Sequence, residues 1–116
     1  ISELTFIGDR NINLKMKEKL NNYTLNEKSK NFILKISSVA EKIVLAKNIS
    51  GDPTNFKSIV TVNIEVLNKN NLQIIESFSY SNNDNKIDLK RYEREINNNL
   101  AETITDKLIF KLSNIQ

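Results

Sequence analysis

The strongest constraint on the fold is a pair of segments, residues 56–67 and 72–80, in which apolar side chains alternate with polar ones. In the first segment one face carries the apolar set, which is Phe56, Val60, Val62, Ile64 and Val66, with Ser58 among them. The opposite face carries Lys57, Thr61, Asn63 and Glu65. A period of two is typical of a strand with one buried face and one face in water. Residues 56–67 are therefore predicted to form such a strand.

The two segments are predicted to form an antiparallel hairpin with a connection of three or five residues. The core face of the second segment is also even-numbered, and it carries Leu72, Ile74, Phe78 and Tyr80. A two-residue loop would pair even with odd positions and expose one of the two apolar sets. Asn70 or Asn71 is expected to supply the positive φ of the turn. Glu76 is the charged exception on this face, and we expect it at a margin of the sheet or at a bulge.

A long terminal helix is predicted from apolar residues at three- and four-residue steps. These residues are Leu89, Tyr92, Ile96, Leu100, Ile104, Leu108 and Leu112. Such spacing places them along one stripe of a helix. Asp88 is the expected N-cap, because an aspartate side chain can accept hydrogen bonds from the first free backbone amides.

The N-terminal third of the chain predicts a short strand followed by a helix. Residues 3–7 alternate weakly and end at Gly8-Asp9, which is a turn signal. Apolar residues then recur at helical spacing, at Ile12, Met16, Leu20 and Tyr23. Asp9 or Asn11 is expected to cap this helix. Residues 23–31 are polar and are predicted to form a loop.

Residues 32–48 are predicted to be extended, in one of two arrangements. Phe32, Leu34 and Ile36 share one face, but the alternation becomes irregular from Ser38 onward. Either a bulge or bend near Ser38 interrupts one long strand, or residues 32–38 and 42–48 form separate strands. Residues 48–53 contain the only Pro and one of the two Gly, and they predict a loop.

These elements predict a single α+β domain over residues 1–116, in the order β-α-β-β-β-α. The first and last helices are expected to cover one face of a four-stranded, mostly antiparallel sheet, which makes a two-layer sandwich. The 116 residues are enough to bury a core without disulfides.

The composition excludes several kinds of chemistry. The chain has no Cys and no His, so it lacks thiolate nucleophiles, the commonest general base and the commonest transition-metal ligand. Its two Gly cannot form a glycine-rich phosphate loop. We therefore expect no enzymatic activity, no cofactor and no metal. The net charge of +3 is spread along the chain, without the concentrated basic stripe of a nucleic-acid groove.

The candidate functional surface is the sheet face turned away from the helices. Lys35 and Lys57 are expected there, with Ile59, Leu67 and Ile75 as apolar interruptions among polar residues. Scattered apolar residues on a wet face need no special explanation. Three large aliphatic side chains on one small sheet also fit a contact surface, so these five residues are the candidate contacts for a ligand or partner.

The organisation of nearly the whole chain resembles the lipopolysaccharide-assembly lipoprotein family (LptE). The resemblance rests on the Gly8-Asp9-Arg10 turn into the first helix, on Phe32-Ile-Leu-Lys-Ile in the second strand, and on the hairpin over 56–80. It also rests on the Asn82-Asn83-Asp84-Asn85 loop and on the closing segment Tyr92-Glu93 … Asn99-Leu100-Ala101-Glu102 … Ile104 … Leu108. The richness in Asn and Lys, which an AT-rich genome explains, looks like the alphaproteobacterial type.

The resemblance implies a non-enzymatic periplasmic lipoprotein domain at the outer membrane. It would plug and help to assemble an outer-membrane β-barrel, the LptD-like lipopolysaccharide-assembly protein, and would assist transport of lipopolysaccharide to the cell surface. Membrane contact would come from an N-terminal lipid anchor. The chain starts at Ile1 rather than Met, so we expect a mature or trimmed chain whose lipidated Cys lies upstream.

The alternative interpretation is a ferredoxin-like module that binds nucleic acid or protein. Modules that bind RNA on a sheet place aromatic side chains on its open face. Here Phe56, Phe78 and Tyr80 share the parity assigned to the core. We therefore expect no nucleic-acid partner.

Overall fold

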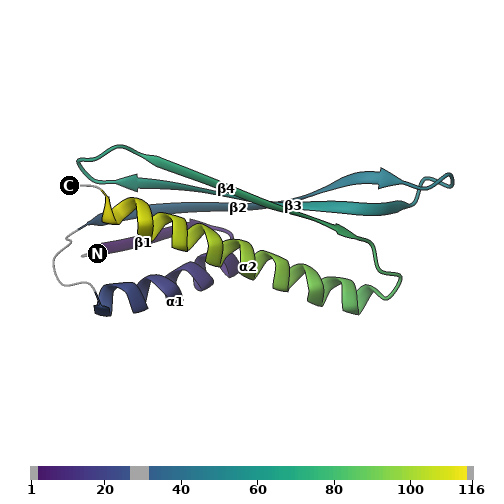
Figure 1. The fold of residues 1–116 in the computed structure, drawn as a ribbon, viewed down its shortest axis with the longest axis horizontal. Coiled ribbons are helices and arrows are strands. Elements are labelled where there is room, and N and C mark those ends of the chain that lie inside the picture. Colours follow the sequence, from purple (N-terminus) through teal and green to yellow (C-terminus); the bar gives the residue numbers. More distant parts are fainter. Residues whose placement is uncertain (1–2, 27–31, 115–116) are drawn as a thin grey trace.

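The computed structural model describes residues 3–26 and 32–114, which form four strands and two helices. The elements are β1 (Glu3–Gly8), α1 (Arg10–Asn26), β2 (Ile33–Lys47), β3 (Pro53–Val66), β4 (Leu72–Ser81) and α2 (Lys86–Ser113). The strands form one sheet in the order β1-β2-β3-β4 (Figure 1). β1 runs parallel to β2 across the α1 crossover, and the remaining neighbours are antiparallel. The predicted element order is confirmed.

Both helices lie on the same face of the sheet, so the predicted two-layer α+β sandwich is confirmed (Figure 1). α1 packs on β1 and β2, α2 packs on β3 and β4, and the two helices contact each other. The molecule is elongated, with extents of 57 × 24 × 21 Å. α1 covers one end of the sheet, whereas α2 runs along most of its length (Figure 1).

The hairpin of β3 and β4 has the predicted register, with even positions facing even positions. Phe56 pairs with Tyr80 and Val62 pairs with Ile74. The connection over residues 67–71 has five residues, one of the two predicted lengths. The positive φ of 64° belongs to Asn68, so the prediction of Asn70 or Asn71 was wrong. The turn closes directly after the strand through Lys69 N and Val66 O at 3.0 Å, which makes Asn68 its third residue.

The core consists of the even-numbered sheet face and the apolar stripes of both helices. Its fully buried side chains include Ile12, Met16, Leu20, Leu34, Ile36, Val60, Val62, Ile64, Ile104, Leu108 and Leu112. Phe78 departs from the prediction, because 47% of its surface is exposed. β4 is an edge strand, so no neighbouring strand covers the outer side of this ring. Glu76 on the same strand therefore lies at a sheet margin, as expected, where it pairs with Lys107.

β2 is one continuous strand, so the alternative of two separate strands is wrong, and the bulge or bend near Ser38 of the other alternative is absent. The pairing with β3 is regular through Ser38 and becomes irregular only between Val44 and Lys47. Ser38 stays on the core face at 1% exposure and donates a hydrogen bond to Asn13 Oδ1 at 2.6 Å. A buried serine with a partner on α1 thus occupies a core position. In the sequence the same serine looks like an interruption of the apolar alternation.

The start of α1 is as predicted, but its end is not. Asp9 Oδ1 accepts a hydrogen bond from Ile12 N at 2.9 Å, so Asp9 is the cap. The helix continues to Asn26, and the predicted loop is wrong for residues 23–26. Tyr23, the last residue of the predicted apolar stripe, is buried at 8% exposure. The rest of that predicted loop, residues 27–31, lies outside the described residues.

α2 begins before the predicted cap. Asn85 Oδ1 accepts hydrogen bonds from Ile87 N at 3.0 Å and Asp88 N at 3.2 Å, so Asn85 is the N-cap and Asp88 lies in the first turn. Ile87 is 72% exposed and lies off the apolar stripe. The stripe therefore could not indicate the first turn of the helix.

Gly8 allows the chain to pass from β1 into α1 against β2, and we predict that Gly8→Ala is strongly destabilising. Gly8 has φ of +100°, and a Cβ at this position would lie 2.1 Å from Ser38 O. We expect a loss of at least about 2 kcal/mol in the free energy of unfolding, measured by urea denaturation, because strain and a backbone clash add together.

Gly51→Ala is the matched control for this prediction. Gly51 also has a positive φ, of +86°, but a Cβ there would meet nothing within 4 Å. Its cost should be about 1 kcal/mol, from backbone strain alone. Equal losses for the two variants would contradict the clash.

Candidate functional site

The outer face of the sheet brings three of the five predicted contact residues together. Lys57 and Ile59 are successive outward-facing residues of β3. Ile59 pairs with Ser77 on β4, and Ile75 lies one outward position away on that strand. Ile75 is 53% exposed. Cross-strand neighbours at this diagonal are within reach of one another's side chains.

The other two predicted residues lie at the opposite end of the outer face. Lys35 pairs with Glu65, and Leu67 N donates to Ile33 O at 3.0 Å. Along β3, Leu67 follows Ile59 by eight residues, which is about 27 Å of extended strand. The five candidates therefore form two separate groups, and one small ligand cannot contact both.

Two apolar residues of β2 join the first group, although the sequence analysis did not include them. Val39 pairs with Thr61, which in turn pairs with Ile75 on its other side. Ile43 pairs with Lys57. Val39 is 50% exposed and Ile43 is 39% exposed. We call Val39, Ile43, Ile59 and Ile75 the outer apolar patch. Continuing the odd parity of Ile33, Lys35 and Ser37 without a bulge would have revealed the β2 members.

The β2–β3 hairpin tip, residues 41–52, is the second exposed apolar surface. All of its residues are exposed, and they include Val44 at 46%, Leu45 at 49% and Ile49 at 107%. The tip reaches past the start of α2, at the end of the sheet that α1 does not cover (Figure 1). Asn48 closes it, because its side chain accepts a hydrogen bond from Asp52 N at 2.9 Å.

A polar network fastens α2 to the base of this hairpin tip. Glu93 Oε2 accepts hydrogen bonds from Lys42 Nζ at 2.8 Å and from the Tyr80 hydroxyl at 2.5 Å. Lys42 Nζ also lies 4.1 Å from the centroid of the Phe56 ring. A cation over an aromatic face is attracted to it, so Lys42 joins both layers.

The network shifts the pKa values of two of its members. Partial burial would raise the pKa of Glu93, but the hydrogen bonds from Lys42 and Tyr80 and the charges of Lys42 and Lys90 outweigh it. The pKa of Glu93 is therefore lowered from 4.5. Burial, followed by the hydrogen bond to Glu93, raises the pKa of Tyr80 above its ordinary value. Both shifts favour the observed pairing of an ionised carboxylate with a neutral phenol.

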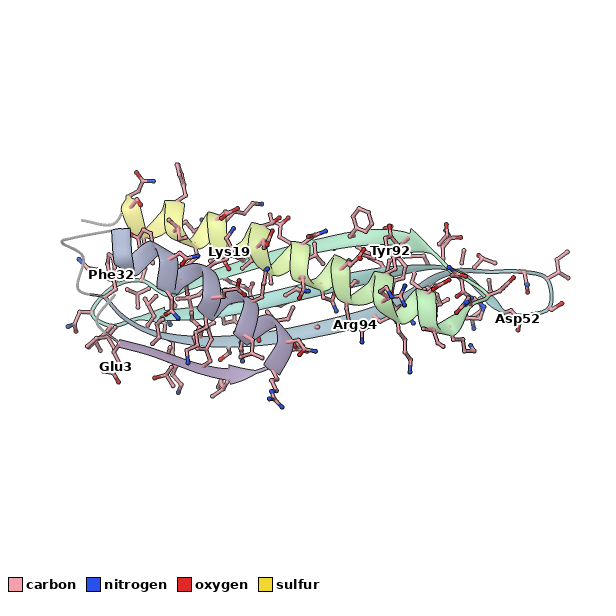
Figure 2. The ribbon with its side chains drawn as sticks, turned by 90° about the horizontal axis from the view of Figure 1, so that it is seen from below. Glu3, Lys19, Phe32, Asp52, Tyr92 and Arg94 are labelled. Carbon is pink, nitrogen blue, oxygen red and sulfur yellow. The ribbon has the colours of Figure 1, made fainter. Side chains whose placement is uncertain are left out.

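Grooves lie on both sides of α2. One of about 240 Å³ lies beside β4 and is lined by residues that include Phe78, Tyr92, Ile96 and Leu100. The other, of about 360 Å³, lies between the helices, and its lining includes Asp9, Lys15, Glu18 and Arg94. Figure 2 shows Tyr92 on the β4 side of α2 and Arg94 on the side of α1. The first groove is lined mainly by apolar and aromatic side chains, and the second by charged ones.

Neither a membrane-spanning helix nor a metal cluster occurs in the described part of the chain. Over residues 3–26 and 32–114, no helix combines the length and the apolar character needed to cross a bilayer. Within the same ranges, no three acidic side chains come together as metal ligands.

The fold is shared with solved structures of bacterial lipoproteins. Rare lipoprotein B from Shewanella oneidensis superposes with a TM-score of 0.68 at 13% identity, over 97% of each chain. A minor lipoprotein from Acinetobacter baumannii gives a TM-score of 0.61 at 12% identity, over 95% of this chain and 92% of its own. The chain matches no family model and no curated protein sequence. At these identities the structural similarity establishes the fold.

Glu93→Gln should destabilise the protein at neutral pH by about 1–2 kcal/mol, because a charge-assisted hydrogen bond to Lys42 is lost. The pKa of Glu93 in the folded protein lies below its ordinary value of 4.5. The stabilisation is therefore fully present above pH 4.5 and is lost as the pH falls through the folded-state pKa. Urea denaturation at several pH values measures the difference.

Glu41→Gln makes the same charge change at an exposed carboxylate of β2 beside Lys42. We expect it to change stability by less than about 0.5 kcal/mol at every pH. A Glu93→Gln effect that persisted unchanged in acid would contradict the ionic origin of the stabilisation.

Proposed function

We propose that this chain is the periplasmic domain of a non-enzymatic outer-membrane lipoprotein. In this role it sits inside an LptD-like outer-membrane β-barrel, helps to assemble that barrel and assists delivery of lipopolysaccharide to the cell surface. The fold supports the proposal, because the structure of rare lipoprotein B superposes on this chain over 97% of both chains. An N-terminal lipid anchor would hold the domain at the membrane. The alphaproteobacterial origin is not part of the proposal, because the comparisons do not favour that group.

The observation that carries the partner role is the position of the exposed apolar side chains. The outer apolar patch and the hairpin tip both lie on parts of the sheet that neither helix covers. An elongated body of 57 × 24 × 21 Å with apolar residues along it suits burial inside a larger cylindrical partner. Apolar contact with a barrel wall would remove both surfaces from water.

The proposed contact with lipopolysaccharide rests on the two outer-face lysines. Lys35 is exposed on β2 and Lys57 is half-buried on β3. Ammonium groups bind phosphate as point charges, which suits a phosphorylated lipid headgroup. Because the two lysines lie at different ends of the face, each would contact a separate phosphate.

The positions of the aromatic residues disfavour the ferredoxin-like nucleic-acid alternative. Phe56 and Tyr80 are buried on the helix side at 6% exposure each, and Phe78 has the same parity. No aromatic side chain of the described strands lies on the open face. Bases would therefore find no stacking platform there.

Val39→Asp combined with Ile75→Asp should reduce recovery of the barrel partner at least about tenfold in a co-expression pull-down, because two carboxylates would be buried against the barrel. Both residues are at least 50% exposed, so the isolated domain should stay folded. Leu14→Asp, at a residue of α1 that is 55% exposed, is the matched control and should retain the partner. Undiminished recovery with the double variant would exclude the outer apolar patch as the contact.

Lys57→Glu should weaken binding of purified lipopolysaccharide several-fold, and a second change at Lys35 should weaken it further, because each removes one phosphate contact. Fluorescence titration with labelled lipopolysaccharide measures both steps. Lys17→Glu, on the exposed side of α1, makes the same change in net charge and should leave binding intact. Equal losses from Lys17→Glu and Lys57→Glu would indicate general charge attraction, not a site.

A further inference from the structure

β4 presents a ten-residue open edge whose free backbone groups can be assigned. Among the strands formed by residues 3–26 and 32–114, β4 has β3 as its only neighbour. Asn82 N donates to Thr54 O at 2.8 Å, which continues the β3–β4 ladder. Even-numbered residues of β4 are therefore in the hydrogen-bonded pairs with β3. The amide and carbonyl groups of the odd-numbered residues, including Ile75, Ser77 and Ser79, point to the open edge.

This edge lacks the features that usually prevent strand pairing. Edge strands are commonly protected by proline, by lysine, by a bulge or by an unpaired inward charge. β4 contains no Pro and no Lys, and its pairing with β3 has no register shift. Its single charged residue, Glu76, is already bound to Lys107 of α2. An added strand would therefore meet one charged side chain along β4, and that charge is already paired.

Exposed aromatic side chains gather beside the same edge. Phe78 is 47% exposed and Tyr92 is 43% exposed, and both line the groove of about 240 Å³ between β4 and α2. Phe110 is 70% exposed and lies further along the same side of α2, close to Thr103. Aromatic residues grouped on one side of a molecule are typical of the core of a protein interface.

We propose that two copies of this chain pair through β4, in antiparallel orientation about a two-fold axis at Ser77. The two sheets would become one continuous sheet with all helices on the same face. In this register Ile75 lies opposite Ser79 of the second copy, and Gln73 lies opposite Ser81. All the outward-pointing backbone groups of residues 73–81 then find partners. The dimer does not depend on the function proposed for the monomer.

Neighbouring registers fit less well. An axis at Glu76 would place two like charges directly opposite each other, which is destabilising. An axis at Phe78 would move Gln73 past the end of the partner strand, which stops at Ser81. The axis at Ser77 uses the whole strand and brings the two Phe78 rings to diagonal positions. Diagonal neighbours about 7–8 Å apart are within reach of aromatic side chains.

The same two-fold axis produces complementary contacts between the two α2 helices. Ser58, which pairs with Phe78, donates to Asn97 of α2, and Glu76 binds Lys107. The middle of that stretch, at Glu102, therefore lies level with Ser77. Antiparallel α2 helices centred there bring Tyr92 within one helical turn of Phe110 of the second copy. The two β4 strands would lie about 5 Å apart, and each α2 lies beneath β3 and β4, about 5 Å from the axis. The two α2 helices would therefore be about 10 Å apart, which is a normal packing distance.

Sedimentation velocity over about two decades of concentration around the micromolar range tests the dimer. We expect a reversible monomer–dimer equilibrium, and Phe78→Lys should raise its dissociation constant at least about tenfold, because two ammonium groups would meet near the axis. Ile7→Lys is the matched control, since Ile7 is 50% exposed on β1, the strand at the opposite edge of the sheet. It should leave the dissociation constant unchanged. A protein that stays monomeric at every concentration overturns the proposal.

A cysteine placed on the axis tests the register. Ser77→Cys should form a disulfide-linked dimer on mild oxidation, because residues paired across the axis have Cα atoms about 5.5 Å apart. Gln73→Cys is the matched control on the same outer face, since its two copies would be about 27 Å apart. The chain has no other Cys, so any linked dimer reports the introduced residue. Equal cross-linking of both variants, or none at Ser77→Cys, overturns the two-fold axis.

Discussion

The fold depends on keeping even-numbered residues of β2, β3 and β4 on the same face of the sheet. Leu34 pairs with Val66, and Val62 pairs with Ile74, so each ladder joins even positions to even positions. The five residues between Val66 and Leu72 preserve this parity. A slip of one residue would turn Lys57 and Glu65 inward and expose the apolar set. The core, the cover of helices and the composition of the outer face all follow from this pairing.

Two buried serines add polar contacts to this apolar face. Ser38 donates to Asn13 of α1, and Ser58 donates to Asn97 of α2, each at 2.6 Å. Apolar packing is tolerant of small axial shifts, whereas a buried hydroxyl without its partner costs about 1–3 kcal/mol. Each pair therefore fixes the position of one helix along the sheet. The serines look like imperfections in the alternating pattern, but they define the alignment of the two layers.

Much of the architecture could be predicted from periodicity, and the errors have identifiable causes. The long apolar runs specified four strands, two helices and the parity of the hairpin, because burial enforces those patterns. The positions of Asn68 and Asn85 could not be selected, because several asparagines near each turn satisfy the same local rules. The continuity of β2 was missed at Ser38, where the partner that makes a polar residue acceptable lies on another element.

The candidate contact surface was predicted less completely than the fold. Lys57, Ile59 and Ile75 were placed on the outer face by alternation, and the structure brings them together. Val39 and Ile43 were missed because both alternatives for residues 32–48, a bulge near Ser38 and two separate strands, broke the alternation before these positions. The exposure of Phe78 depends on the order of strands, which determines that β4 is at the edge. The order of strands in a sheet is a tertiary property, and it cannot be predicted from the alternation of residues within one strand.

The unequal lengths of the helices, 17 residues in α1 and 28 in α2, give the domain two ends of different thickness. Where both helices lie under the sheet, backbone amides are shielded by two packed elements. Toward residues 41–52 the β2–β3 ribbon has water on both sides. Local opening follows the density of such packing, so we expect the thin end to open more readily than the thick end. One continuous pair of strands, β2 and β3, thus has a well-packed end covered by both helices and a sparsely packed end at residues 41–52.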